Sequence, residues 1–391
     1  MNLVHDFDEY VERRNTDSKK YGSGDFSEDV LPMWIADTDF RSPEPVVKTA
    51  IERASHGLFG YPYDTEEFNE VVKNWMVKRH NWAIETKDIA FVSGVVHGAL
   101  YTLDAFTNQG DKVVCLTPLF GPLQSIVEEN GRHIVKSSMI EKNGFYTIDF
   151  EDLETKLKDP RVSMFILCNP HNPVGRVFTV EELEKIGNLC LENDVIIFND
   201  EVHADIVFSG SKHVSIPSIS KELSQITVTG MNPGKTFNVG GIRTASVIIQ
   251  NPKMMEKFLI ARKKHKGLGR TVFGQNIFIS CYRDCEYYVN QMVDYIEKNI
   301  DYVKSYIDEN IKEIKFRKPE GMYLLWLDCR KLNLTQEQLM NLFKEEGKIG
   351  MNSGTSFGVE GTGFVRLNVA VPRTVLEEGM KRIKKAVDSL K

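Results

Sequence analysis

The stretch VTGMNPGKTFNVGGIRTA, residues 228–245, decides between two kinds of α/β protein. It overlaps a short apolar run, QITVTG, that predicts a β-strand, and it carries a Gly-Lys-Thr tripeptide centred on Lys235. A nucleotide-binding P-loop needs four residues between its two glycines and a helix directly after them. Gly230 and Gly234 have only three residues between them, and the following Gly-Gly pair makes a poor first helical turn. The stretch therefore argues against a P-loop.

Lys235 then has two remaining interpretations. It is either an ordinary surface lysine or a lysine that takes part in chemistry itself. It lies just past a predicted strand, among apolar and small residues, which is where a buried lysine with a shifted pKa is found. The rest of the chain has to decide between the two.

Composition excludes several classes of function. The chain has 391 residues, a formal net charge of −6 and 41% hydrophobic residues, enough for a large core. Nucleic acids and anionic membranes attract proteins with a positive field, so the mild acidity argues against both as partners. No apolar run approaches the length of a membrane span, and the first residues do not resemble a signal peptide.

The cysteine and histidine patterns point to a cytoplasmic protein without a metal. No Cys-x-x-Cys pair and no His-Glu-x-x-His motif occurs, so neither a structural nor a catalytic metal is expected. In a large chain without an export signal, scattered cysteines are typical of reduced thiols. The six are Cys115, Cys168, Cys190, Cys281, Cys285 and Cys329.

The middle of the chain alternates apolar, β-branched runs with amphipathic helical patterns. This alternation predicts an α/β fold with a mostly parallel sheet sandwiched by helices. One helix has a clear start, because Thr179 and Glu182 form a capping box. From about residue 286 a long helix leads into a smaller α+β domain. We expect a large domain over 45–286 and a small one from 1–44 and 287–391.

Ligands of such sheets collect at the carboxyl ends of the strands, so the residues that follow each strand are informative. Singly, each has an ordinary explanation as a turn, a helix cap, a core residue or a solvated charge. Together they suit a ligand with a phosphate, a stackable ring, a phenolic oxygen, a basic ring nitrogen and an aldehyde. Pyridoxal 5′-phosphate (PLP) has these groups. The sequences that follow the strands are SGVVHGAL, TPLFGP, CNPHNPVGR, NDEVHADI and the stretch around Lys235.

At this point the chain resembles a known family over essentially its whole length. It is similar to the fold-type I PLP enzymes of the class I/II aminotransferase superfamily, and within them to the cystathionine β-lyase-like carbon–sulfur lyases. The motifs that carry the resemblance include LPMWIADTDF, HGLFGYPY, PHNPVGR, DEVHADIV, GKTFNVGGIR and GFVRLNVAVPR.

The resemblance implies a role for each matching residue. Lys235 is expected to form the Schiff base with PLP and to act as the catalytic base. Tyr61 matches a tyrosine that relatives contribute from a partner subunit, so a homodimer with shared sites is implied. Arg366 is expected to bind the substrate α-carboxylate, with Asn172 beside it. The other expected cofactor contacts are Asp200 at the ring nitrogen, Asn172 at the phenolic oxygen, His203 where relatives often carry Tyr, Phe120 stacked on the ring, and Gly94, Val95, Val96 and Arg243 at the phosphate.

Two positions depart from the family pattern. Relatives commonly have a hydroxyl residue directly before the lysine and another three residues before it. Here those positions are Gly234 and Asn232. The phosphate site therefore lacks hydroxyl donors, and we expect PLP to be retained less tightly than is usual for the family.

The resemblance leaves the reaction open between three functions. We expect a β-eliminating lyase that converts L-cystathionine or L-cysteine-type amino acids into pyruvate, ammonia and a thiol. An aminotransferase is the alternative, and only its need for a keto-acid acceptor would separate the two. A regulatory binding protein on the same fold is the third. A nucleic-acid role for the basic stretch 261–270 is disfavoured by the negative net charge.

Overall fold

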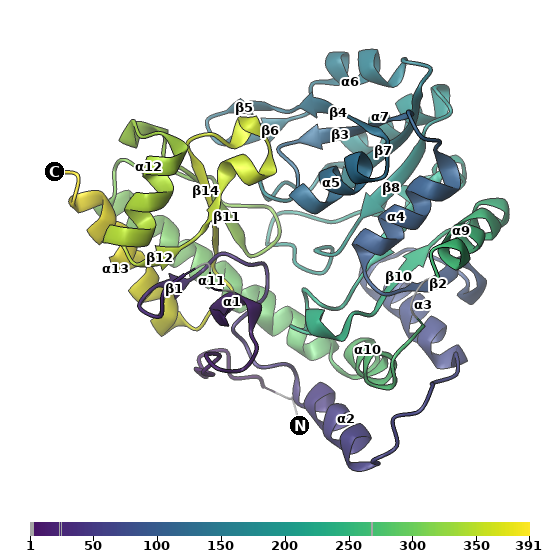
Figure 1. Cartoon of the computed structure of the whole chain (residues 1–391), viewed down its shortest axis with the longest axis horizontal. Coiled ribbons are helices and arrows are strands. Elements are labelled where there is room, and N and C mark those ends of the chain that lie inside the picture. The colour runs from purple at the N-terminus through teal and green to yellow at the C-terminus, as the bar shows by residue number, and fades with distance from the viewer. Residues whose placement is uncertain (1–3, 23, 25, 267–268) are drawn as a thin grey trace.

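A seven-stranded sheet forms the centre of the larger part of the chain (Figure 1). The computed structural model describes residues 4–22, 24, 26–266 and 269–391. The strand order is β2-β10-β9-β8-β7-β3-β4, and only β10 runs antiparallel to its neighbours. The predicted mostly parallel α/β sheet is therefore confirmed. The strands are β2 (Ile89–Val92), β3 (Lys112–Thr117), β4 (His133–Ser138), β7 (Val162–Cys168), β8 (Ile196–Asp200), β9 (Thr227–Met231) and β10 (Ala245–Ile248).

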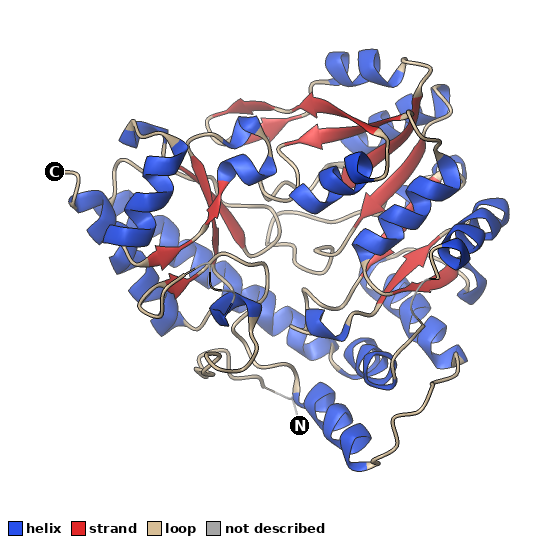
Figure 2. Cartoon of the chain, in the orientation of Figure 1, coloured by secondary structure: helices blue, strands red, loops and turns tan. Residues whose placement is uncertain are grey.

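Helices cover both faces of this sheet (Figure 2). Because side chains alternate along a strand, Val113 of β3 packs into one core cluster and Val114 into the other. Burial on both faces explains why these strands are continuously apolar rather than alternating. One face is covered by α4 (Val95–Phe106), α5 (Gly121–Glu129) and α9 (Pro252–Lys264), and the other by α6 (Phe150–Leu157), α7 (Val180–Glu192) and α8 (Lys221–Ser224).

The start of α7 confirms the predicted capping box. The Thr179 hydroxyl accepts from the backbone N–H of Glu182, and the Glu182 carboxylate accepts from the backbone N–H of Thr179.

The close packing of α4 against the sheet depends on a glycine. A Cβ on Gly230 of β9 would lie 2.6 Å from Val95 Cγ1, so the absence of a side chain lets the first turn of α4 lie against the sheet. This turn borders the cavity described below.

The remaining part of the chain packs around a long helix, α11 (Glu286–Asn310), as the sequence predicts (Figure 1). A three-stranded antiparallel sheet, β11-β14-β13, lies beside it. The N-terminal residues join this part, since β1 pairs with β12 in parallel. The elements are β1 (Leu31–Pro32), β11 (Leu324–Asp328), α12 (Gln336–Asn341), β12 (Ile349–Gly350), β13 (Asn352–Ser353), β14 (Phe364–Asn368) and α13 (Arg373–Asp388).

The other elements lie at the edges of these two parts. The helices α3 and α10 pack through Phe68 and Phe278, whose rings stack at 4.3 Å between centroids. The division into domains at residues 45 and 286 remains a prediction. These elements are α1 (Lys19–Gly22), α2 (Glu44–Ser55), α3 (Glu66–His80), α10 (Val272–Asp284) and the hairpin β5 (Ile140–Lys142) and β6 (Phe145–Thr147).

Within the described ranges, no helix combines the length and apolar character needed to cross a membrane.

The basic stretch 261–270 includes Gly267 and Leu268, which lie outside the described residues. Two of its arginines are engaged with the protein itself. Arg262 donates to the carbonyl of Phe91 at 2.8 Å, and the Arg270 guanidinium lies 4.0 Å from the centroid of the Phe68 ring.

Candidate active site

A cavity of about 880 Å³ lies at the carboxyl ends of β8 and β9, between the two parts of the chain. It is bordered by the first turn of α4, by the loop that carries Lys235 and by the N-terminal segment 35–42. Most of the residues predicted from the sequence meet here. They are Val95, Val96, Phe120, Asn172, Asp200, His203, Lys235 and Arg243.

Lys235 follows β9 and points its amine toward the N-terminal segment. Its Nζ donates a hydrogen bond to the carbonyl oxygen of Ala36 at 2.5 Å. Burial and the nearby charge of Arg366 lower the pKa of Lys235 to about 8, while Asp37 and Asp200 oppose this lowering. A lysine with such a pKa is partly neutral near physiological pH and is therefore a nucleophile and a base.

This pKa gives a test on the protein with a free Lys235 amine. Only the neutral amine reacts with an acylating reagent, so the acetylation rate of Lys235 should rise with pH and level off just above pH 8. An ordinary exposed lysine, with a pKa near 10.4, should still gain reactivity at pH 10. Mass spectrometry of pulse-acetylated, cofactor-free protein measures both in one sample. A Lys235 rate that keeps rising up to pH 10 would contradict the burial argument.

Asp200 ends β8, and only 4% of its surface is exposed. Burial raises its pKa to about 6, and the backbone N–H of Val202, which donates to its Oδ1 at 3.1 Å, acts in the other direction. A buried carboxylate stabilises a positive charge placed beside it, because the charge restores the favourable interactions lost with water. Asp200 can therefore hold a protonated ring nitrogen.

The first turn of α4 forms a candidate anion site. Gly94 precedes this 12-residue helix, and no side chain caps its free backbone N–H groups. The Arg243 guanidinium lies close by, since its charge, after burial, lowers the pKa of His97 on the same turn. Arg243 has no side-chain hydrogen bond or ion pair among the described residues. Helix N-termini and arginine both favour phosphate, so these groups can bind one.

Arg366 lies in β14 and is 4% exposed, yet it has no carboxylate partner within the described part of the chain. Its guanidinium donates only to neutral oxygens: Asn172 Oδ1 at 2.9 Å, Asn352 Oδ1 at 2.8 Å and the Trp34 carbonyl at 3.1 Å. Burial lowers its pKa to about 10. Because a buried, unpaired charge is costly, this arrangement favours binding of an anion. A carboxylate suits the planar fork of arginine.

The two Asn-Pro pairs of the loop after β7 differ in what they do. Both peptide bonds are cis. Asn172 faces the cavity through its contact with Arg366. Asn169 faces the loop instead, where its Oδ1 accepts from the backbone N–H of Phe178 at 3.1 Å. Only Asn172 is therefore available to a ligand.

His203 and Phe120 are two of the ring-bearing residues that line the cavity. Burial, followed by the charges of Lys235 and Arg366, lowers the pKa of His203 well below its usual value, so the imidazole is neutral. Its Nδ1 has no hydrogen-bond partner among the described residues. Phe120 stands directly before α5, where an aromatic face borders the space. A buried polar atom without a partner needs a ligand or water.

Gly234 and Asn232 depend on one another in the folded loop. The Asn232 Oδ1 accepts a hydrogen bond from the backbone N–H of Gly234. A Cβ on Gly234 would lie 2.4 Å from that oxygen and 3.0 Å from Gly240 Cα. A serine or threonine directly before Lys235 therefore has no room unless Asn232 also changes. The weaker retention of PLP stays a prediction.

Tyr61 lies outside the cavity in this single chain and is fully exposed. It belongs to the exposed segment 56–63, which also presents large apolar side chains to solvent. These are Leu58, Phe59 and Tyr63, with exposed fractions of 69%, 59% and 79%.

Sequence reasoning missed the contribution of the N-terminal segment. The carbonyls of Trp34 and Ala36 accept hydrogen bonds from Arg366 and Lys235, and Asp37 acts on Lys235 through its charge. The motif LPMWIADTDF marks this segment in the sequence, but backbone acceptors leave no residue-type signal.

A buried network behind Lys235 was also missed. The Thr236 hydroxyl donates to Asp205 Oδ2 at 3.0 Å, and His80 and Trp75 contact Asp205 Oδ1 at the same distance. These contacts fix the residue next to Lys235.

These features fit PLP. Lys235 offers an amine, Asp200 a carboxylate for a ring nitrogen, and Asn172 and His203 polar atoms for an oxygen. Two glycines of the cavity lining, Gly240 and Gly241, have free space beside them, since a Cβ on either would meet nothing within 4 Å.

Comparisons with known proteins agree with this fit. A family model described as "Aminotransferase class I and II" matches residues 28–383. Cystathionine beta-lyase PatB of Bacillus subtilis is 38% identical over 97% of this chain and 99% of its own length. Protein MalY of Escherichia coli is 28% identical over 99% of this chain and 100% of its own. Cystalysin from Treponema denticola, whose crystal structure contains a pyridoxal 5′-phosphate cofactor, has a TM-score of 0.96 at 34% identity, covering both chains completely.

Proposed function

The chain belongs to the class I and II aminotransferase family, and within that family we propose that it is a PLP-dependent carbon–sulfur lyase. Its substrates are L-cystathionine and L-cysteine-type amino acids, and its products are pyruvate, ammonia and a thiol. The observation that carries the proposal is the buried Arg366, held by neutral oxygens only, which contacts Asn172 of the cavity lining and acts through its charge on Lys235. Relatives named cystathionine beta-lyase support the reaction type.

PLP, when bound, supplies an aldehyde for amines and an electron-withdrawing ring that stabilises negative charge at the substrate Cα. In our proposal Asp200 keeps the ring nitrogen protonated and Phe120 stacks on the ring. Asn172 and His203 contact the phenolic oxygen. The phosphate lies against Gly94, Val95 and Val96 at the start of α4, with Arg243 beside it.

Arg366 and Lys235 have complementary tasks. Arg366 would bind the substrate α-carboxylate through two parallel hydrogen bonds and so would fix the orientation of the bonds at Cα. Lys235, released by the substrate, takes the Cα proton on its Nζ. The low pKa of this amine, about 8, leaves it partly neutral and ready to accept a proton.

Loss of the Cα proton is followed by cleavage of the Cβ–S bond, whose electron pair leaves on sulfur. Phe120 has no hydroxyl to offer this sulfur, so we assign its protonation to the proton held on Lys235 Nζ. The released 2-aminopropenoate then takes up water and yields pyruvate and ammonia. Atoms and charge balance without any oxidant or second substrate.

Product stoichiometry tests this proposal. Purified holoenzyme supplied with L-cystathionine alone should form pyruvate, ammonia and homocysteine in equal amounts. Transfer of the amino group to an added keto acid, with little thiol released, would instead identify an aminotransferase.

The active form is proposed to be a homodimer in which Tyr61 reaches the phosphate of the partner subunit's site. Support comes from segment 56–63, whose exposed apolar side chains are unusual for a monomer. The expected mass in solution is twice the 44.6 kDa of the chain.

Charge within that segment should break the dimer. Leu58→Arg should lower the mass toward that of one chain and reduce PLP retention, because an unpaired charge in an apolar interface is strongly unfavourable. Analytical ultracentrifugation measures this. Ile140→Arg is the matched control, since Ile140 is also exposed but lies in β5, outside the segment. An unchanged mass in both variants would refute the role of the segment.

All six cysteines are buried and unpaired. Free thiols are typical of a reducing compartment, so a cytoplasmic location is part of the proposal.

A further inference from the structure

Asp37 is a carboxylate of the cavity that the proposed function leaves without a role. It lines the cavity, and 29% of its side chain is exposed. Its neighbour Ala36 accepts the hydrogen bond from Lys235, and Trp34, three residues before it, accepts one from Arg366. Asp37 therefore lies beside the groups that are proposed to bind and deprotonate the substrate.

The backbone around Asp37 accepts hydrogen bonds from Asn368 of β14 and from Tyr323. The side-chain amide of Asn368 in β14 donates to the carbonyls of Ile35 and Asp37 at 2.8 and 2.6 Å. The Tyr323 hydroxyl donates to the Ala36 carbonyl at 3.3 Å. These contacts fix the segment relative to Arg366, which lies two residues before Asn368 on the same strand.

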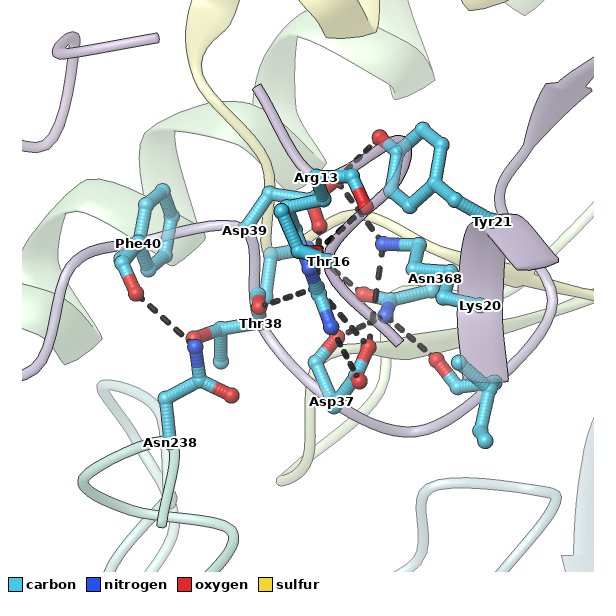
Figure 3. Close-up of polar contacts among 12 residues, drawn as sticks. Arg13, Thr16, Lys20, Tyr21, Asp37, Thr38, Asp39, Phe40, Asn238 and Asn368 are labelled. Carbon is cyan, nitrogen blue, oxygen red and sulfur yellow. Dashed lines mark hydrogen bonds and ion pairs between the residues drawn. The ribbon is translucent and has the colours of Figure 1, made fainter. Parts of the chain in front are cut away.

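Arg13 holds the Asp37 side chain in one orientation (Figure 3). Its Nη2 donates to Asp37 Oδ2 at 2.8 Å and its Nη1 lies 3.3 Å from Oδ1. Arg13 also donates to Asp39 Oδ1 at 2.6 Å and to the Thr38 carbonyl at 3.0 Å. A bidentate arginine fixes the plane of a carboxylate but occupies only part of its acceptor capacity.

The other cation of this cluster is directed mainly at Asp39. Lys20 Nζ lies 2.9 Å from Asp39 Oδ2 but 3.9 Å from the nearer oxygen of Asp37. Both carboxylates line the cavity, but the Asp39 side chain is buried, whereas 29% of the Asp37 side chain is exposed. Each oxygen of Asp37 therefore retains a lone pair for a further donor.

The negative charge of Asp37 acts on Lys235, the proposed catalytic base. Burial and Arg366 lower the pKa of Lys235, and Asp37 is the first of the two carboxylates that oppose this lowering. The carboxylate thus acts on a cation beside it even though it is paired with Arg13. A cationic group on a substrate in the same cavity would experience the same attraction.

We propose that Asp37 is a specificity-determining residue whose carboxylate receives an ammonium group carried by the leaving thiol, on the far side of the Cβ–S bond. This inference rests on the proposed lyase function. L-cystathionine has such an ammonium group on its homocysteine half. S-(3-carboxypropyl)-L-cysteine is the same molecule without that amino group, so the pair isolates the contact.

The test compares kcat/KM for these two substrates with purified holoenzyme. Wild-type protein should prefer L-cystathionine by about 10- to 100-fold, the usual worth of a hydrogen bond between charged groups. Asp37→Asn should reduce the preference to within a few-fold of one, mainly by raising KM for L-cystathionine. Asp37→Glu, which keeps the charge, should retain part of the preference.

Asp17→Asn is the matched control, because Asp17 also lines the cavity but is exposed. It should leave the preference unchanged. The cofactor's visible spectrum and the unfolding midpoint of each variant report whether the site is intact.

The outcomes separate this inference from the function on which it rests. Equal kcat/KM for the two substrates in wild-type protein would overturn the inference, even if Asp37→Asn did not fold. So would an Asp37→Asn variant that slows both substrates by the same factor, since that result would mean that Asp37 only adjusts Lys235. Failure of wild-type protein to release pyruvate from either substrate would overturn the lyase function itself.

Discussion

Lys235→Ala should lower turnover of L-cystathionine by about 10⁴-fold or more, because a single amine serves as both the nucleophile for the cofactor and the base at Cα. Burial keeps the pKa of this lysine near 8, and its Nζ is directed at Ala36 rather than at solvent. Among the residues that the structure describes, the other lysine that lines the cavity is Lys19, which comes from the N-terminal segment. Continuous measurement of pyruvate gives the rate.

The fold should survive this substitution. The hydrogen bond of Lys235 is to the carbonyl of Ala36, which also accepts one from the Tyr323 hydroxyl, so this carbonyl keeps a donor when the amine is removed. Lys212→Ala is a suitable control, because Lys212 is exposed and lies outside the cavity. It should retain wild-type activity and wild-type unfolding. Retention of more than a tenth of the activity by Lys235→Ala would contradict the assignment of this lysine.

Arg366→Ala should mainly weaken binding of the amino acid. Truncating a buried group that pairs with a charged partner costs about 2–5 kcal/mol, which corresponds to roughly 30- to 4000-fold in kcat/KM. Most of the loss should appear in KM, because the α-carboxylate is bound before and during the reaction. The absorption of the bound cofactor should remain, since Arg366 is not among the proposed cofactor contacts.

Two further variants sharpen this test. Arg366→Lys should recover only part of the loss, because an ammonium group cannot reproduce the planar fork. Arg330→Ala removes an exposed arginine of the same part of the chain, one that pairs with Asp328 and Glu141. It should behave like wild-type protein. An unchanged KM in Arg366→Ala would show that the carboxylate binds elsewhere.

The residues at strand ends were predictable because each follows a recognisable apolar run. Asp200 directly ends β8, and Lys235 follows β9 after a short loop. In a parallel sheet these ends lie on one edge, so residues distant in sequence meet in one cavity. The direction of β10 was not predictable in this way, since an apolar strand carries no mark of whether its neighbour is parallel.

The N-terminal wall of the cavity could not be predicted from local patterns. The contact between Lys235 and Ala36 spans 199 positions, and that between Arg366 and Trp34 spans 332. Both use backbone carbonyls, which every residue type provides. Asp37 appears in the sequence only as an acidic residue in a loop, and its position at the cavity depends on Arg13 and Asn368.

The contribution of a partner subunit is the feature that is hardest to infer from one chain. Tyr61 was predicted from resemblance, and here it stands in solvent among other apolar side chains. Its proposed site lies on a second copy, so neither periodicity nor strand ends could locate it.

The most direct test of the account is the time course of pyruvate from L-cystathionine with purified holoenzyme, added PLP and no keto acid. The lyase account predicts many turnovers per active site at a constant initial rate, with homocysteine formed in step. A reaction that stops after about one turnover per site, and resumes only when a keto acid is added, would contradict it and would identify an aminotransferase.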